Sequence, residues 1–323
     1  MKTIQENIRQ HNSENMSYSG FSQYQWDENH KFAVQAALAA NRPLLVRGEP
    51  GVGKSSLARA AAIELQRHCI AEVVTAKTEP NDLLWQFDGV RRLGDATAVC
   101  NIDQKQVAEL LDRKKYTSPG VLWWAFQPKQ AYDQFIQCPT GACPSSKVRE
   151  RVAPGTDTTG WVVLIDEIDK ADADVPNSLL GALADQEFQV PGFDVPIQQA
   201  SVKPPLIIIT TNEERELPPA FLRRCFVLHM DFPNEDQKTW LKDRARKHTT
   251  TVSDDVMNTM ADMLLTAREH AQGCHTPGLA EYIDFVCAYE KLLEAEHQKS
   301  NGLDGAAILK RIASFTLHKN ARR

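Results

Sequence analysis

A run of glycines followed by lysine and serine, at residues 48–55, has the spacing of a loop that holds phosphate groups. The run reads Gly-Glu-Pro-Gly-Val-Gly-Lys-Ser and fits the P-loop pattern G-x-x-x-x-G-K-[ST]. Its glycines let successive backbone N–H groups turn inward around the phosphates. In such a loop Lys54 reaches the β- and γ-phosphates, and the Ser55 hydroxyl is a ligand of Mg²⁺. The residues predicted to contact the nucleotide are Gly48, Glu49, Pro50, Gly51, Val52, Gly53, Lys54, Ser55 and Ser56.

Two adjacent carboxylates follow an apolar segment in the middle of the chain. Residues 161–165 read Trp-Val-Val-Leu-Ile and lead directly to Asp166 and Glu167. An apolar run rich in β-branched residues predicts a buried strand, whose carboxyl end would carry both acids. Downstream of a phosphate-binding loop we expect Asp166 beside the Mg²⁺ and Glu167 next to the γ-phosphate. A solvated turn is the alternative.

The loop needs a strand before it and a helix after it. Residues 43–47 form a short apolar run, which predicts a buried strand entering the loop. Strong helix formers follow the loop, with Leu57, Ala61 and Leu65 at i, i+4 spacing. The helix begins near Lys54, so its positive dipole end would point at the same anions.

Strand and helix patterns alternate along the first two thirds of the chain. Apolar runs predict strands at 43–47, 70–75, 161–165, 205–212 and 225–230. Helices are predicted at 27–40, 54–65, 103–116, 174–183 and 217–224, and a turn with a short helix at 79–84. A hairpin is predicted at 188–197, turning at Pro191-Gly192, and residues 138–160 read as an irregular connection.

Beyond residue 232 the strand patterns stop. Helices are predicted at 235–247, 254–272, 277–296 and 304–318. This change places a domain boundary near 232. Residues 1–20 are polar and read as a flexible tail.

Composition narrows the class of protein. The chain has 323 residues, a formal net charge of −5 and 42% hydrophobic residues, enough for a real core. No overall basic field points to nucleic acid, although a local basic patch would not show in the total. The seven cysteines favour reduced thiols in a cytoplasmic protein. No signal peptide or membrane-spanning segment is recognisable.

Three segments each allow two interpretations. Cys138 and Cys143 form a close pair, which is either half of a zinc site or two thiols in a loop. Residues 118–126 contain two tryptophans and predict either a buried helix or an exposed contact loop. The aromatic residues within 21–26 either anchor the chain by packing or lie beside an adenine ring.

Taken in order, these motifs resemble the AAA+ ATPase superfamily, over roughly residues 25–300. The segments 79–84, 166–171 and 188–192 are similar to its MoxR/dynein-related branch. The resemblance implies an α/β P-loop NTPase core, with a parallel five-stranded sheet in the order 5-1-4-3-2 flanked by helices. A C-terminal α-helical lid would complete it. The implied domains are a core over 21–231, with inserts around 85–160 and a hairpin around 188–200, and a lid over 232–323.

The resemblance also implies roles for single residues, with ATP and Mg²⁺ as cofactors. Asp166 would order the Mg²⁺ shell with Ser55, and Glu167 would polarise the attacking water. Asn212 matches the sensor 1 position. Arg224, with Arg223 as the fallback, matches an arginine finger that acts on a neighbouring subunit. A plain helix-end cation is the alternative for both arginines.

One segment departs from the family pattern. A sensor 2 arginine is expected early in the third lid helix, but residues 275–282 read His-Thr-Pro-Gly-Leu-Ala-Glu-Tyr. The sequence therefore does not identify a residue that would contact the γ-phosphate from the lid of the same chain. Either hydrolysis is slow or another subunit supplies the charge.

Three functions compete. The first is a MoxR-like ATPase ring, most simply a hexamer, that remodels a protein partner such as a von Willebrand factor A domain protein. The second is a nucleic-acid-directed or defence-system NTPase similar to McrB, possible with GTP. The third is a nucleotide-gated scaffold with little turnover. The acidic charge balance weighs against the second, and the absent arginine favours the third.

Overall fold

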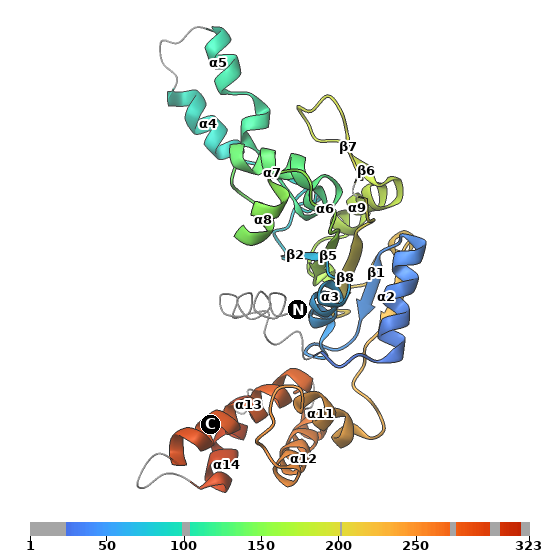
Figure 1. Cartoon of the computed structure of the whole chain (residues 1–323), viewed down its shortest axis with the longest axis vertical. Helices are drawn as coiled ribbons and strands as arrows, with labels where there is room; N and C mark the ends of the chain where they lie inside the picture. The colour runs from blue at the N-terminus through green and yellow to red at the C-terminus, as the bar shows by residue number, and fades with distance from the viewer. Residues whose placement is uncertain (1–23, 99–103, 201, 272–275, 298–303, 318–323) are drawn as a thin grey trace, which may run out of the picture. The chain divides into compact units, whose positions relative to one another are not determined.

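The structure is a computed structural model that describes residues 24–98, 104–200, 202–271, 276–297 and 304–317 (Figure 1). The tail expected over residues 1–20, Phe21 and His275 lie outside these ranges. By its internal contacts the chain divides into two compact units. The sheet unit comprises Glu28–Arg47 and Ala61–His229. The lid unit comprises the described residues up to Asp27, the segment Gly48–Ala60 and the described residues from Met230.

A five-stranded parallel sheet forms the centre of the sheet unit. Its strands are β1 (Leu44–Arg47), β2 (His68–Val73), β5 (Trp161–Asp166), β8 (Leu206–Thr211) and β9 (Phe226–His229). Their order in space is β2-β5-β8-β1-β9. If these five strands are numbered 1 to 5 along the chain and the sheet is read from β9 to β2, the order is the predicted 5-1-4-3-2. The central strands β5 and β8 are buried almost throughout, as expected for parallel strands covered on both faces.

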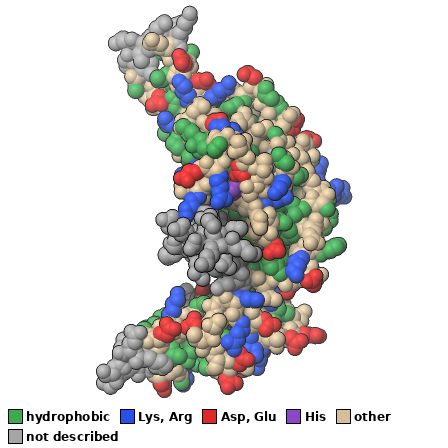
Figure 2. All heavy atoms as spheres, in the orientation of Figure 1, with side chains coloured by type: hydrophobic (Ala, Val, Ile, Leu, Met, Phe, Trp, Pro, Cys, Tyr) green, Lys and Arg blue, Asp and Glu red, His purple; other side chains and the backbone are tan. Residues whose placement is uncertain are grey.

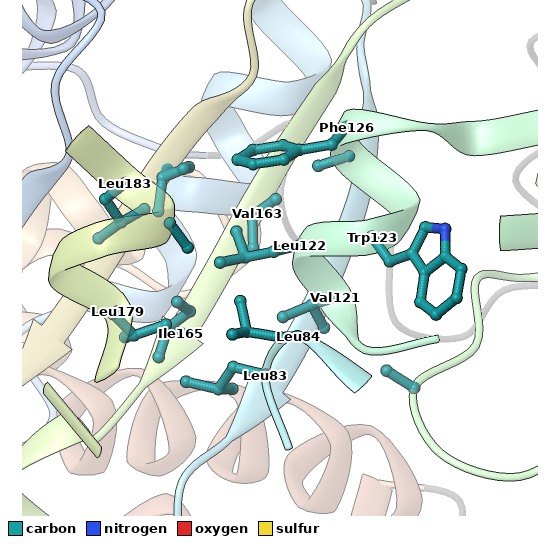
Figure 3. Close-up of a cluster of buried hydrophobic side chains, with 14 of the residues drawn as sticks. Leu83, Leu84, Val121, Leu122, Trp123, Phe126, Val163, Ile165, Leu179 and Leu183 are labelled. Atoms are coloured by element: carbon teal, nitrogen blue, oxygen red, sulfur yellow. The ribbon is translucent and has the colours of Figure 1, made fainter. Parts of the chain in front are cut away.

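Helices cover the sheet and complete its core. Helix α2 (Glu28–Ala40) packs against β1, β8 and β9, and α6 (Val121–Phe126) packs against β2 and β5. Figure 3 shows Leu122 and Phe126 of α6 beside Val163 of β5. Helix α9 (Asp174–Asp185) contributes further leucines to the same cluster. The whole of α6 is buried, including both tryptophans, so the buried-helix interpretation of 118–126 is confirmed.

The insert before β5 has more structure than predicted. It contains β3 (Trp85–Phe87), α4 (Gly89–Ala98), α5 (Gln104–Leu110), η2 (Arg113–Tyr116), β4 (Thr117–Pro119), α7 (Pro128–Gln137) and α8 (Ser146–Val152). In Figure 1, α4 and α5 lie beyond α6–α8, away from the sheet. The single helix predicted over 103–116 is wrong, because the Asp112 side chain accepts from the Lys114 N–H and starts a 3₁₀ turn. Of the turn and short helix predicted over 79–84, only turns are present, and α8 lies inside the stretch predicted to be irregular.

Two shorter elements follow the predictions more closely. The hairpin is present as β6 (Glu187–Phe188) and β7 (Ile197–Gln198), and its turn uses Gly192 at φ 94°. Helix α10 (Pro219–Leu222) precedes β9 and ends just before the two candidate arginines. On α2, Ala37 is buried against the sheet unit, whereas Phe32 is exposed.

The lid unit has a helical core of its own. Its helices are α11 (Gln237–Ala245), α12 (Asp254–His270), α13 (Leu279–His297) and α14 (Gly305–Thr316). Leu241, Met257, Tyr282 and Ile308 are among the side chains that form this core. From Phe232 on, the described residues form helices and connections without strands, as the sequence pattern predicts. Of the helices described, none has both the length and the apolar character needed to cross a membrane.

Candidate functional site

The P-loop, residues 48–55, connects β1 to α3 (Lys54–Glu64). Gly48, Gly51 and Gly53 all have positive φ, at 143°, 79° and 102°, which side chains rarely tolerate. At Gly48 a Cβ atom would lie 2.0 Å from the carbonyl oxygen of Met230. No other residue type fits that close approach. At Gly53 a Cβ would meet nothing within 4 Å, so only the backbone conformation requires glycine.

Lys54 is held against the loop that precedes it. Its side chain is only 6% exposed, and Nζ donates to the carbonyl oxygens of Gly48 at 2.7 Å and Glu49 at 2.8 Å. The ammonium and the N-terminus of α3 therefore bring positive charge to the same short loop. Ser55 and Ser56 follow in the first turn of the helix, and both are partly accessible.

The predicted carboxylates lie in the sheet unit, at the carboxyl ends of adjacent strands. Asp166 ends β5, and the parallel register with β8 pairs the residue before it, Ile165, with Ile209, the residue before Thr210. The buried Thr210 hydroxyl donates to Asp166 Oδ1 at 2.5 Å and accepts from the Glu167 N–H at 2.9 Å. Thr210 therefore joins the two acids, a role that the sequence prediction missed.

Glu167 and Asn212 are brought into contact. The Asn212 Nδ2 group donates to Glu167 Oε1 at 3.2 Å. The other carboxylate oxygen pairs with Lys170 Nζ at 2.6 Å. This hydrogen bond and the charge of Glu167 raise the pKa of Lys170. Glu167 itself sits at φ 60° and ψ 48°, a left-handed conformation that is unusual for a side-chain-bearing residue and marks candidate functional positions.

Two more contacts fasten the strand ends around this cluster. The buried Asp169 accepts from the backbone N–H groups of Asn212 at 3.3 Å and Glu214 at 2.9 Å. Arg47, the last residue of β1, pairs with Glu213 at 2.6 Å. The loop after β8 is therefore tied both to the turn after β5 and to the strand that enters the P-loop.

The profile of the dynein-related subfamily of AAA domains matches residues 43–225, which is more than half of the chain. The chain belongs to this family. The matched range contains the P-loop, both carboxylates, Asn212 and both candidate arginines.

The chain also resembles solved structures of RuvB. A point mutant of RuvB from Thermotoga maritima aligns with a TM-score of 0.45 and 16% identity, covering 89% of this chain and 68% of that one. A second Thermotoga maritima structure, described as the RuvB Holliday junction branch migration motor, aligns with a TM-score of 0.42 and 16% identity. It covers 90% of this chain and 69% of the other. No curated protein matches the chain.

The two candidate arginines of this AAA domain lie just after α10. Both are exposed, and Arg224 Nη1 donates to the carbonyl oxygen of Ala220 at 3.2 Å. Within one chain, Arg224 thus makes the helix-end contact that the sequence left as the alternative. Exposure leaves either arginine accessible to a neighbouring subunit, and the finger role stays a prediction.

The remaining ambiguous segments are also placed. Tyr24 and Trp26 pack edge to face with ring centres 5.1 Å apart, and Asp27 pairs with Arg244 of α11 at 2.9 Å. These contacts favour the packing interpretation of the aromatic cluster. Cys138 is buried and Cys143 is exposed, both as free thiols. Over the described ranges, no group of three or more His, Cys, Asp or Glu side chains is placed to hold a metal ion.

Proposed function

We propose that this AAA domain protein is a MoxR-like ATPase that hydrolyses ATP in a ring-shaped oligomer, most simply a hexamer, to remodel or activate a protein partner. The observation that carries the hydrolysis step is the Glu167–Asn212 contact at the end of two adjacent strands. A carboxylate and an amide side by side supply an acceptor and a donor for one water molecule.

The residues divide the chemistry between them. The P-loop N–H groups and Lys54 hold the phosphates, and α3 adds its N-terminal dipole. The Ser55 hydroxyl and the Asp166 carboxylate suit Mg²⁺, which prefers oxygen ligands. When bound, Mg²⁺ neutralises charge on the phosphates. Glu167 then polarises the attacking water, which Asn212 orients.

A protein partner fits the charge of the chain better than nucleic acid. The formal net charge is −5. On the face drawn in Figure 2, the described Lys and Arg side chains are interspersed with Asp and Glu. Nucleic-acid binding relies on clustered positive charge, so we propose a protein substrate or a von Willebrand factor A domain partner.

The hydrolysis step is tested by Glu167→Gln. The amide keeps the shape of the side chain but is a far weaker proton acceptor, so ATP binding should persist while most turnover is lost. The same variant should trap the ATP-bound protein with its partner in a pull-down. Phosphate release near the wild-type rate would remove Glu167 from the mechanism.

The ring is tested by mixing two inactive proteins, Arg224→Ala and Glu167→Gln. If Arg224 acts on the neighbouring subunit, mixed rings contain some interfaces with an intact Glu167 and an intact Arg224. Partial ATPase activity should then return on mixing. Near-normal turnover by Arg224→Ala alone, or no recovery on mixing, would contradict the finger.

A further inference from the structure

An arginine of the lid forms an ion pair with a residue of the P-loop, a contact that the family pattern does not include. Arg268, near the end of α12, pairs through Nη2 with Glu49 Oε2 at 2.8 Å. Its Nη1 donates to the carbonyl oxygen of Pro277 at 2.7 Å, and its guanidinium lies 3.9 Å from the ring centre of Phe232. The Arg268 side chain is 15% exposed, against 48% for Glu49. Arg268 is thus held in place by the lid, and its partner on the loop is the more exposed of the two side chains.

Several carboxylates lie near the P-loop, although the loop is expected to bind an anion. Glu49 belongs to the loop itself. The Asp231 carboxylate lies 3.5 Å from the point where a Cβ would sit on Gly48, and Glu281 lies 3.6 Å from the corresponding point on Gly51. Negative charge near the loop opposes the binding of a triphosphate. Pairing with Arg268 offsets the charge of Glu49.

The same lid segment also contacts the loop through its backbone. The Ala280 N–H, at the start of α13, donates to the carbonyl oxygen of Gly51 at 3.1 Å. A Cβ on Gly278 would lie 3.4 Å from the carbonyl oxygen of Pro50. Arg268 also bonds to Pro277, the residue before Gly278 in the same segment. It is therefore placed to fix both the charge and the position of the loop.

We propose that Arg268 is a positioning residue that sets the affinity of the P-loop for a nucleoside triphosphate by neutralising Glu49. The proposal rests on the proposed function, since it assumes that the loop binds ATP. It differs from the family pattern, in which the lid cation stands on the third lid helix. Here the cation stands on the second, α12, and acts through a residue of the loop.

The experiment is a charge rescue in the full-length protein. A fluorescent, non-hydrolysable ATP analogue is titrated with Mg²⁺ into wild type, Arg268→Gln, Glu49→Gln and the double variant. Arg268→Gln keeps part of the packing on Phe232 and should raise Kd by about three- to tenfold, in the range of a partly exposed ion pair near a charged ligand. Glu49→Gln keeps the backbone N–H groups that the loop offers to the phosphates and removes one negative charge beside them, so it should lower Kd below that of wild type. The double variant should return to within about twofold of wild type.

Other results would overturn the proposal. Unchanged Kd in Arg268→Gln would show that the ion pair does not matter for binding. A double variant as weak as Arg268→Gln would show that Arg268 acts otherwise, on the nucleotide or on the lid fold. Raised salt should shrink the Arg268→Gln effect, which a purely structural defect would not show. Lys54→Ala serves as the reference: if it binds like wild type, the proposed function fails rather than this inference.

Discussion

The P-loop and the carboxylate cluster each have their own internal contacts, and these contacts differ in kind. In the loop, Lys54 bonds to backbone carbonyls five and six residues away, and glycine conformations set the turn. In the cluster, side chains bond across 43 to 45 residues, through Thr210 to both acids and from Asn212 to Glu167. Because the contacts of Lys54 within the loop join residues close in sequence, a short sequence motif is enough to predict them. A cluster built across strands depends on the order and register of the sheet.

The largest expected effect is in the loop. Lys54→Ala removes the one side chain that the loop supplies to the β- and γ-phosphates, so ATP affinity should fall at least about a hundredfold. Isothermal titration with ATP and Mg²⁺ measures this directly. Lys54→Arg is the matched control, because it keeps the charge but not the compact ammonium. Unchanged affinity in Lys54→Ala would mean that the loop is not a nucleotide site.

The second prediction separates the two reasons for glycine within the loop. Gly48→Ala places a Cβ 2.0 Å from the Met230 carbonyl oxygen, so backbone must move. We expect it to cost about 3 kcal/mol or more and to abolish ATP binding. Gly53→Ala meets no atom within 4 Å and should cost only the left-handed strain, about 1–2 kcal/mol. Thermal melts of the two variants test the difference, and equal losses would contradict it.

The same contrast explains what the sequence could predict. Strand, loop and helix at residues 43–65 follow from a local pattern, and strand order followed from the family resemblance. Thr210 stood at the end of a predicted strand, but its bond to Asp166 depends on register between β5 and β8. The break at Asp112 was missed because a side-chain bond to a nearby N–H competes with helix formation. A subunit interface leaves no such signal in one chain, so the roles of Arg223 and Arg224 stay predictions.

The third prediction addresses the cluster. Thr210→Val keeps the shape of a buried side chain but removes the hydroxyl that accepts from the Glu167 N–H and donates to Asp166. A donor left without its partner costs about 1–3 kcal/mol. We expect that loss in stability together with a fall in kcat of about tenfold and little change in ATP affinity. Thr210→Ser, which keeps the hydroxyl, should retain most of the turnover. Equal turnover in the two variants would show that the hydroxyl does not organise the acids.

The smallest expected effect concerns the Lys170–Glu167 ion pair. The two side chains are 40% and 30% exposed, so solvent screens the pair and its contribution to stability stays below about 1 kcal/mol. Its effect on chemistry is more direct. An ammonium 2.6 Å from Glu167 occupies a carboxylate oxygen that would otherwise be free to accept a hydrogen bond from the attacking water.

Lys170→Ala should therefore raise kcat about two- to threefold, with KM and melting temperature nearly unchanged. Since the ion pair raises the pKa of Lys170, the ammonium persists through neutral pH and is lost only as pH rises through that raised value. The ratio of variant to wild-type kcat should thus stay constant between about pH 6 and 9. Lys170→Arg keeps the positive charge and should behave like wild type. A fall in kcat for Lys170→Ala would reverse the interpretation, because Lys170 would then orient Glu167 for catalysis, as Thr210 orients its backbone.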